Sequence, residues 1–289
     1  MKHFPASQLI INDDGSIFHL HLKPEQLADN VILVGDPGRV ALVASFFDTQ
    51  ECSVSSREFN TITGTYEGKR ISVISTGIGT DNIDIVLNEL DALANIDLKT
   101  RTEKPDFRQL TIVRIGTCGG MQSEIPLGSF LVSEKSIGFD GVLSFYAGRN
   151  KVCDLEFEKA FKEHMSWNPL LASPYVIDND PELVERIGKN DMLRGVTISS
   201  NGFYGPQGRV LRIGLADTQM NDKIEVFNHN GYKITNYEME GSALAGLATL
   251  MGHKGMTVCC VIAQRRVEAA NTDYKPQIEK LIETVLDRM

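Results

Sequence analysis

Apolar runs of strand length alternate with segments of helical periodicity along this chain, and this alternation restricts the fold more than any other feature. The strand-like runs cover residues 31–34, 71–75, 110–115 and 256–263. The helical segments cover residues 39–47, 81–94 and 275–288. Runs that are apolar throughout are typical of strands buried on both faces, with helices above and below the sheet. We therefore predict an α/β fold: a three-layer α/β/α sandwich around a central mixed β-sheet.

The remaining patterns fit one domain. Residues 61–68 predict a β-hairpin, residues 18–22 alternate like a further strand, and residues 116–120 indicate a glycine-rich turn. The polar residues 99–106 indicate an exposed loop. Because no Pro/Ser/Gly linker and no internal repeat divide the chain, we predict a single domain over residues 1–289.

Composition and charge exclude several classes of protein. A net charge of −9 on 289 residues argues against binding to nucleic acid or to an anionic membrane surface. Five cysteines without CxxC spacing indicate a reduced, intracellular protein without a zinc site. The N-terminus lacks the apolar core of a signal peptide, and the longest clean apolar run, residues 258–263, is too short to span a bilayer. We expect a cytoplasmic protein.

The Gly77-Ile78-Gly79 turn lies between a predicted strand and a predicted helix, where dinucleotide-binding proteins carry a glycine fingerprint. The third glycine of that fingerprint is replaced by Asn82, so we predict no nicotinamide cofactor. The turn instead indicates a backbone that approaches a ligand or a neighbouring strand. No Ser-His-Asp order, HExxH motif or cysteine cluster is present, so covalent or metal-dependent hydrolysis has no support.

Three arginines are candidates for an anion site. Arg39 follows a Gly-Asp-Pro-Gly turn at a predicted helix start, where free N–H groups and the helix dipole attract anions. Arg114 adjoins the end of an apolar strand, where a guanidinium is rarely buried without a planar acceptor. Arg57 lies in a short strand. Together they suit phosphate, although each turn alone also fits an ordinary surface turn.

Two glutamates, Glu238 and Glu240, flank Met239 where a strand pattern changes to a helix rich in small residues. Acids in a first helical turn complement the helix dipole. The small and apolar neighbours indicate burial, however, and a buried carboxylate needs partners such as sugar hydroxyls. Helix capping and sugar binding both stay open for this segment.

The loop over residues 203–209 joins an aromatic pair to Gln207 and Arg209. Glutamine offers an acceptor and donors, whereas arginine offers only donors. The pair would match a planar heterocycle with alternating C=O and N–H groups, and Phe203 could stack on it. A solvated loop is the alternative.

Eight segments in order resemble the nucleoside phosphorylase family, which contains uridine phosphorylases and hexameric purine nucleoside phosphorylases. They read FHLHL, GDPGRV, SREF, STGIGT, RIGTCGG, FYGPQGR, YEMEG and VIAQR. The resemblance implies three groups of site residues. For phosphate they are Gly35, Arg39, Arg114, Thr117 and, from a neighbouring subunit, Arg57. For ribose they are Glu238, Met239, Glu240 and, across a dimer interface, His19. For the base they are Phe203, Gln207, Arg209, Ile262 and Arg265.

Two further positions bear on substrate and ions. Purine members place an aspartate just after the late strand, whereas residues 263–266 here read Ala-Gln-Arg-Arg, with no acid before Glu268. The resemblance therefore points away from purines. Some bacterial members bind potassium between subunits at positions matching Glu58, Ile78 and Asn82; because Asn82 replaces a serine, this ion stays open. We expect no other metal and no organic cofactor.

The resemblance implies phosphorolysis of uridine to uracil and ribose 1-phosphate, in pyrimidine nucleoside salvage or catabolism. Arg114, Glu240, Arg209 and Gln207 would carry the reaction, with inorganic phosphate as co-substrate. The family also implies a homo-oligomer built from dimers, a hexamer, whose subunits share active sites. A preference for thymidine, deoxyuridine or a purine nucleoside stays open, as do a nucleosidase that uses water and a non-catalytic nucleoside-binding relative.

Overall fold

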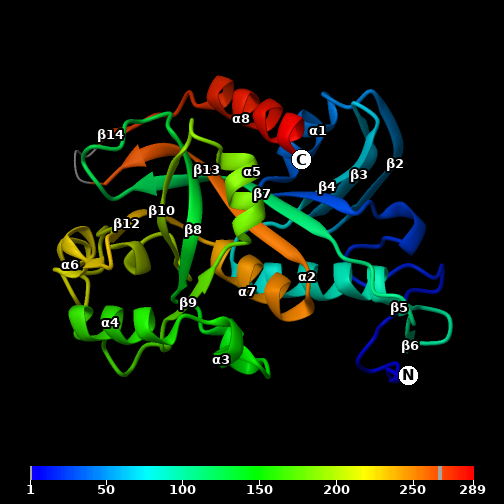
Figure 1. The fold of residues 1–289 in the computed structure, drawn as a ribbon, viewed down its shortest axis with the longest axis horizontal. Helices are drawn as coiled ribbons and strands as arrows, with labels where there is room; N and C mark the ends of the chain where they lie inside the picture. Colours follow the sequence, from blue (N-terminus) through cyan, green and yellow to red (C-terminus); the bar gives the residue numbers. More distant parts are fainter. Residues whose placement is uncertain (1, 266–268) are drawn as a thin grey trace.

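A central mixed sheet forms the core of the computed structural model, which describes residues 2–265 and 269–289 (Figure 1). In spatial order its strands are β11 (Asn228–His229), β12 (Tyr232–Glu238), β10 (Leu193–Ser199), β8 (Phe130–Gly138), β13 (Lys254–Gln264), β7 (Thr111–Gly120), β1 (Asn30–Val34), β4 (Lys69–Ser75), β3 (Phe59–Tyr66) and β2 (Thr49–Ser56). The pairs at its margins are β9 (Tyr175–Asp178) with β8 and β14 (Ala269–Ala270) with β13, and a separate hairpin joins β5 (Ile96–Asp97) to β6 (Thr102–Glu103). Arg266 and Glu268, which bear on the purine argument, lie outside the described residues.

Strand β1 shows why a continuous apolar run is needed in the middle of the sheet. Val31 and Leu33 pack into one hydrophobic core, and Ile32 and Val34 pack into another. Successive side chains of a strand point to opposite faces, so both faces of β1 are buried. The predicted α/β fold with a central mixed sheet is confirmed.

Helices cover both faces of this sheet (Figure 1). The first core includes residues of α2 (Thr80–Asn95) and α7 (Gly241–Met251). The second includes residues of α1 (Pro37–Ala44), α5 (Pro181–Gly188) and α8 (Lys275–Arg288). The other helices are α3 (Arg149–Val152), α4 (Leu155–Met165), α6 (Met220–Val226) and the 3-10 turns η1 (Pro24–Gln26), η2 (Val142–Phe145) and η3 (Gly205–Gln207). No described helix is both long and apolar enough to cross a membrane.

The sheet also closes on itself, which the sequence pattern did not predict. The end of β12 runs antiparallel to β7, where Asn236 pairs with Gly120 and Tyr237 pairs with Gly119. Strands β12, β10, β8, β13 and β7 therefore form a closed ring. This closure brings Glu238, the last residue of β12, and Glu240, in the turn that follows, beside β7 and Arg114.

Three local predictions were wrong. The predicted turn over residues 116–120 is strand, because β13 pairs with β7 as far as Gly120. Residues 18–20 form a turn and residues 21–22 have no regular structure, because the N–H groups of His19 and Leu20 donate to the carboxylate of Glu89 and not to a neighbouring strand. Arg57 lies in the tight turn between β2 and β3, with a φ of 56°, and not in a strand. The polar segment over residues 99–106 is largely an exposed loop, as predicted, but it includes the two residues of β6.

Gly138 in β8 provides a test of the packing. A Cβ there would lie 2.2 Å from the ring of Tyr175, which is fully buried. We expect Gly138→Ala to reduce the free energy of unfolding by about 1–3 kcal/mol, as overpacking does, measured by urea denaturation. The same change at Gly214, where a Cβ would meet nothing within 4 Å, is the control. Equal stability of the two variants would contradict the packing described.

Candidate active site

A cavity of about 700 Å³ lies where β1, β4, β7 and β13 end. Eleven of the side chains and glycines singled out by the sequence line it: Gly35, Arg39, Arg114, Thr117, Phe203, Gln207, Arg209, Glu238, Met239, Glu240 and Ile262. In α/β proteins ligands bind at the carboxyl ends of strands, and this volume suits a small molecule. We therefore take the cavity as the candidate active site.

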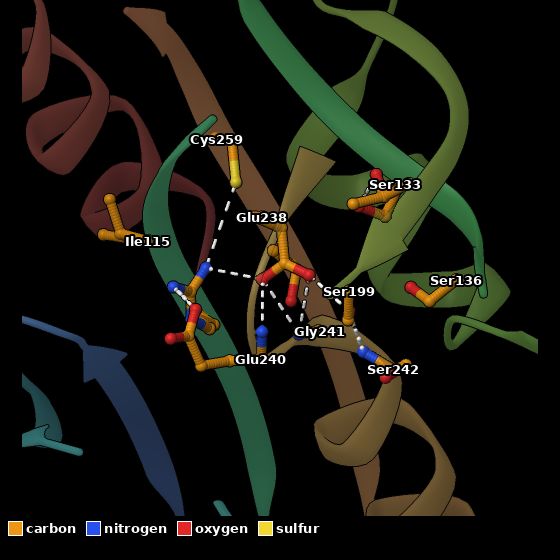
Figure 2. Close-up of polar contacts among 12 residues, drawn as sticks. Ile115, Ser133, Ser136, Ser199, Glu238, Glu240, Gly241, Ser242 and Cys259 are labelled. Atoms are coloured by element: carbon orange, nitrogen blue, oxygen red, sulfur yellow. Dashed lines mark hydrogen bonds and ion pairs between the residues drawn. The ribbon is translucent and has the colours of Figure 1, made fainter. Parts of the chain in front are cut away.

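Within the cavity Arg114 lies between two carboxylates. They belong to Glu238 and Glu240, which Figure 2 labels. Its Nη1 is 3.2 Å from Glu238 Oε2, and its Nη2 donates to Glu240. All three side chains are at most 5% exposed. Burial opposes the charge of Arg114, but Glu240 and Glu238 outweigh it and raise the pKa of Arg114, so the guanidinium stays protonated. Burial also raises the pKa of Glu240, despite the opposing effect of Arg114.

Gly116 provides the space that the guanidinium occupies. A Cβ at Gly116 would lie 2.2 Å from Arg114 Nη1 and 3.1 Å from Cys259 Sγ. Cys259 is the register partner of Gly116 in β13, and its sulfur accepts a hydrogen bond from Arg114 Nη1 at 3.9 Å. The glycine that the sequence indicated as part of a turn therefore serves to admit a buried arginine.

The two glutamates make different contacts. Glu238 accepts the N–H of Glu240 at 2.9 Å and the N–H of Gly241 at 2.9 and 3.0 Å, where α7 begins. Glu240 accepts the N–H of Gly79 at 2.7 Å and a hydrogen bond from Arg114. The two roles left open by the sequence thus divide: Glu238 caps the helix, and Glu240 stands at the cavity between Gly79 and Arg114.

Arg39 is the second arginine of the cavity, and it forms no salt bridge with any described residue. Its guanidinium has one long contact, 3.5 Å from Nη1 to the carbonyl of Ile115. Burial, and then the charge of Arg114, lower the pKa of Arg39. Asp36 caps α1 by accepting the N–H of Gly38 at 2.9 Å. At this helix start an anion could therefore bind the Arg39 side chain but not the N–H of Gly38. An anion between Arg39 and Arg114 would supply the missing acceptor.

The far side of the cavity carries the glutamine–arginine pair. Gln207 is 3% exposed; its Nε2 donates to Ser200 Oγ at 2.9 Å and its Oε1 accepts from Arg209. The guanidinium of Arg209 lies 3.6 Å from the centre of the Phe203 ring. Burial, and then Arg265, lower the pKa of Arg209 to about 10, so it stays charged at neutral pH. Arg265 does not line the cavity but holds the Gln207 carbonyl at 2.8 Å.

Gln264 lies in the stretch over residues 263–266, where purine members carry an aspartate, and its side chain turns away from the cavity. Gln264 Nε2 donates to the carbonyls of Gln122 and Ile125 at 2.8 and 2.9 Å. Its side chain therefore holds the turn that follows β7. It offers no carboxylate to a base.

His19 and Arg57 do not line this cavity, and they lie near one another. The Arg57 guanidinium is 5.8 Å from the Phe18 ring, which makes an edge contact with His19 at 4.7 Å. His19 Nδ1 is 2.6 Å from Glu89 Oε1. Two residues assigned to the site thus lie outside the lining of the cavity.

Several residues at the site were not predicted. Ser199 bonds to Glu238, Ser200 bonds to Gln207, and Cys259 contacts Arg114. A buried serine or cysteine carries no distinguishing motif, so no sequence signal would have found them. Gly79 was predicted to approach a ligand or a strand, and its N–H instead approaches Glu240.

The described residues contain no group of three or more His, Cys, Asp or Glu side chains that could hold a metal ion. Glu58, Ile78 and Asn82, the positions discussed for potassium, line the cavity near Gly77. A Cβ at Gly77 would lie 2.5 Å from Asn82 Nδ2 and 3.2 Å from Glu58 Cγ. The Gly77 turn therefore needs glycine for space as well as for its φ of 71°.

Comparisons with known proteins agree with one another. Residues 29–287 match the model of the phosphorylase superfamily. The uridine phosphorylase of Escherichia coli is 30% identical over 273 residues, covering 91% of this chain and 92% of its own. That of Thermococcus kodakarensis is 28% identical over 267 residues, covering 92% and 83%. The crystal structure of a Trypanosoma brucei nucleoside phosphorylase described as showing uridine phosphorylase activity has a TM-score of 0.87 at 29% identity, covering 97% and 98%.

Gly116 allows a test of the anion site. In Gly116→Ala the new methyl group would displace the Arg114 guanidinium, so we expect phosphate affinity to fall about tenfold or more, in line with the cost of misplacing a binding group. Titration calorimetry with inorganic phosphate measures this. Gly214→Ala, the same change in open space, should leave the affinity unchanged. Wild-type affinity in Gly116→Ala would contradict the role of Arg114.

Proposed function

This chain belongs to the phosphorylase superfamily, and we propose that it cleaves uridine with phosphate to give uracil and ribose 1-phosphate in pyrimidine nucleoside salvage or catabolism. The relatives named uridine phosphorylase support this choice along most of the chain. The observation that carries the proposal is the content of one cavity: two arginines, one of them without a salt bridge to any described residue, a glutamate pair, and a glutamine–arginine pair.

Phosphate is the proposed nucleophile, so the protein needs none of its own. Arg39 and Arg114 would hold the dianion, with Gly35 and the Thr117 hydroxyl on the same cavity wall. Attack at C1′ passes through an oxocarbenium-like state, as in other glycosyl transfers. Holding phosphate against the sugar contributes through proximity, within a ceiling of roughly 7–11 kcal/mol.

The sugar and base would occupy the rest of the cavity. Glu240 would accept the ribose hydroxyls beside Met239. Uracil leaves with negative charge on its carbonyl oxygens. Arg209 and Gln207 would stabilise that charge as it develops, and such stabilisation lowers the barrier because it acts on the transition state. Phe203 and Ile262 would bound the base. The proposed reaction needs no organic cofactor. It does not depend on a potassium ion at Glu58.

We also propose a homo-oligomer built from dimers, a hexamer by resemblance, in which His19 and Arg57 complete the site of a neighbouring subunit. Neither residue lines the cavity of its own chain, and both contact Phe18, which supports this proposal.

The main alternatives concern whether phosphate or water attacks the sugar, and which base is released. A DeoD-type purine nucleoside phosphorylase of Colwellia psychrerythraea is 25% identical over 275 residues, but Gln264 offers no acid here. Release of free base from a nucleoside panel, with and without phosphate, separates the alternatives. We expect uracil from uridine only with phosphate. Release without phosphate would indicate a nucleosidase, and no release a binding protein; both would refute the proposal.

Arg209 tests the assignment of the base. We expect Arg209→Ala to lower kcat/KM for uridine by about 10²-fold, the effect of losing one charge-stabilising donor. Arg212→Ala, an exposed arginine in the same loop outside the cavity, is the matched control. Activity like that of the wild type in Arg209→Ala would show that this residue does not recognise the base.

Mixed oligomers test the shared site. Arg57→Ala and Arg209→Ala chains, each nearly inactive alone, should recover about a quarter of wild-type activity on 1:1 mixing, because half of randomly formed dimers then carry one intact site. Subunit exchange through mild denaturant followed by a uridine assay measures this. Failure to recover activity in verified mixed dimers would place both residues in the same subunit's site.

A further inference from the structure

The two carboxylates at Arg114 differ in how firmly they are held. Glu238 Oε1 accepts from the Ser199 hydroxyl and the Gly241 N–H; Oε2 accepts from the N–H groups of Glu240 and Gly241 and lies 3.2 Å from Arg114 Nη1. A carboxylate has about four lone-pair sites. Glu238, at 1% side-chain exposure, therefore has no acceptor capacity left for a sugar.

Glu240 is held by fewer partners. One oxygen accepts the Gly79 N–H at 2.7 Å and the other accepts from Arg114 Nη2. The backbone of Met239 also bonds to this carboxylate. Of about four lone-pair sites one is therefore left, at the cavity that Glu240 lines. Glu240 can therefore exchange Arg114 for sugar hydroxyls, whereas Glu238 would have to break a helix cap to do so.

Ser199 locks the fixed carboxylate in place. It is the last residue of β10 and the register partner of Glu238 in β12. Its hydroxyl donates to Glu238 and accepts the N–H of Ser242 at 2.8 Å, so it ties the carboxylate to the first turn of α7 (Figure 2). Ser199 is fully buried and does not line the cavity.

We propose that Ser199 and Glu238 are positioning residues that orient Arg114 for phosphate, and that Glu238 makes no contact with the sugar. Nη1 of Arg114 stays on Glu238, and the second N–H of Nη2 is available to phosphate before any sugar binds. The first N–H of Nη2 is released as well when ribose hydroxyls take Glu240. This assignment deepens the proposed function and rests on it for the identity of the sugar, but its phosphate arm can be measured without any nucleoside.

Ser199→Ala tests the proposal, with Ser133→Ala as the matched control. Ser133 is a buried serine of the adjoining strand β8, whose hydroxyl bonds to Thr197 and not to Glu238. Titration with inorganic phosphate alone should show at least fivefold weaker binding in Ser199→Ala and less than a twofold change in Ser133→Ala. With uridine, KM for phosphate should rise by the same factor while KM for uridine changes less than twofold. Ser199→Cys keeps a weak donor and should fall between Ser199→Ala and wild type.

Phosphate affinity in both Ser199 variants equal to that of the control would overturn the proposal. If phosphate binding weakens as expected but the wild type releases no uracil from uridine, the proposed function fails and the positioning role stands. If wild-type protein cleaves uridine and Ser199→Ala raises KM for uridine and for phosphate alike, the role is general folding support and the proposal is wrong.

Discussion

The whole site depends on one buried guanidinium shared by two carboxylates. Burying charge is costly unless geometry and further hydrogen bonds compensate, and removing one partner of such a group leaves an uncompensated charge. Here the compensation comes from distant parts of the chain. Strand β7 supplies Arg114, the end of β12 and the turn after it supply Glu238 and Glu240, and the turn after β4 supplies the Gly79 N–H. The closed ring of strands is what brings these segments together.

The fold was predictable where one local pattern decides the structure. Runs such as residues 31–34 are apolar on both faces, so they had to be central strands. The contact of β12 with β7 was not predictable, because pairing between distant strands leaves no local pattern. Gly116 is an exception to the local pattern: glycine is typical of a turn, but here it lies in a strand and leaves space for Arg114.

For the candidate site, the sequence predicted the chemical groups but not their partners. Arginines beside strand ends and paired glutamates are unusual enough to single out, and eleven of the predicted residues line one cavity. Both glutamates line the cavity, but which of them caps a helix depends on hydrogen bonds to Ser199, Gly241 and Gly79, which only the three-dimensional structure reveals. His19 and Arg57 were assigned to the site through resemblance, and they do not line the cavity. They can contribute to a site only if a second subunit is present.

A crystal structure of the protein with uracil and ribose 1-phosphate tests the account most directly. We expect the phosphate group on Arg39 and Arg114, the ribose hydroxyls on Glu240, and uracil on Gln207 and Arg209, with Glu238 still bound to Ser199. A phosphate group away from both arginines, or ribose hydroxyls bound to Glu238, would contradict it.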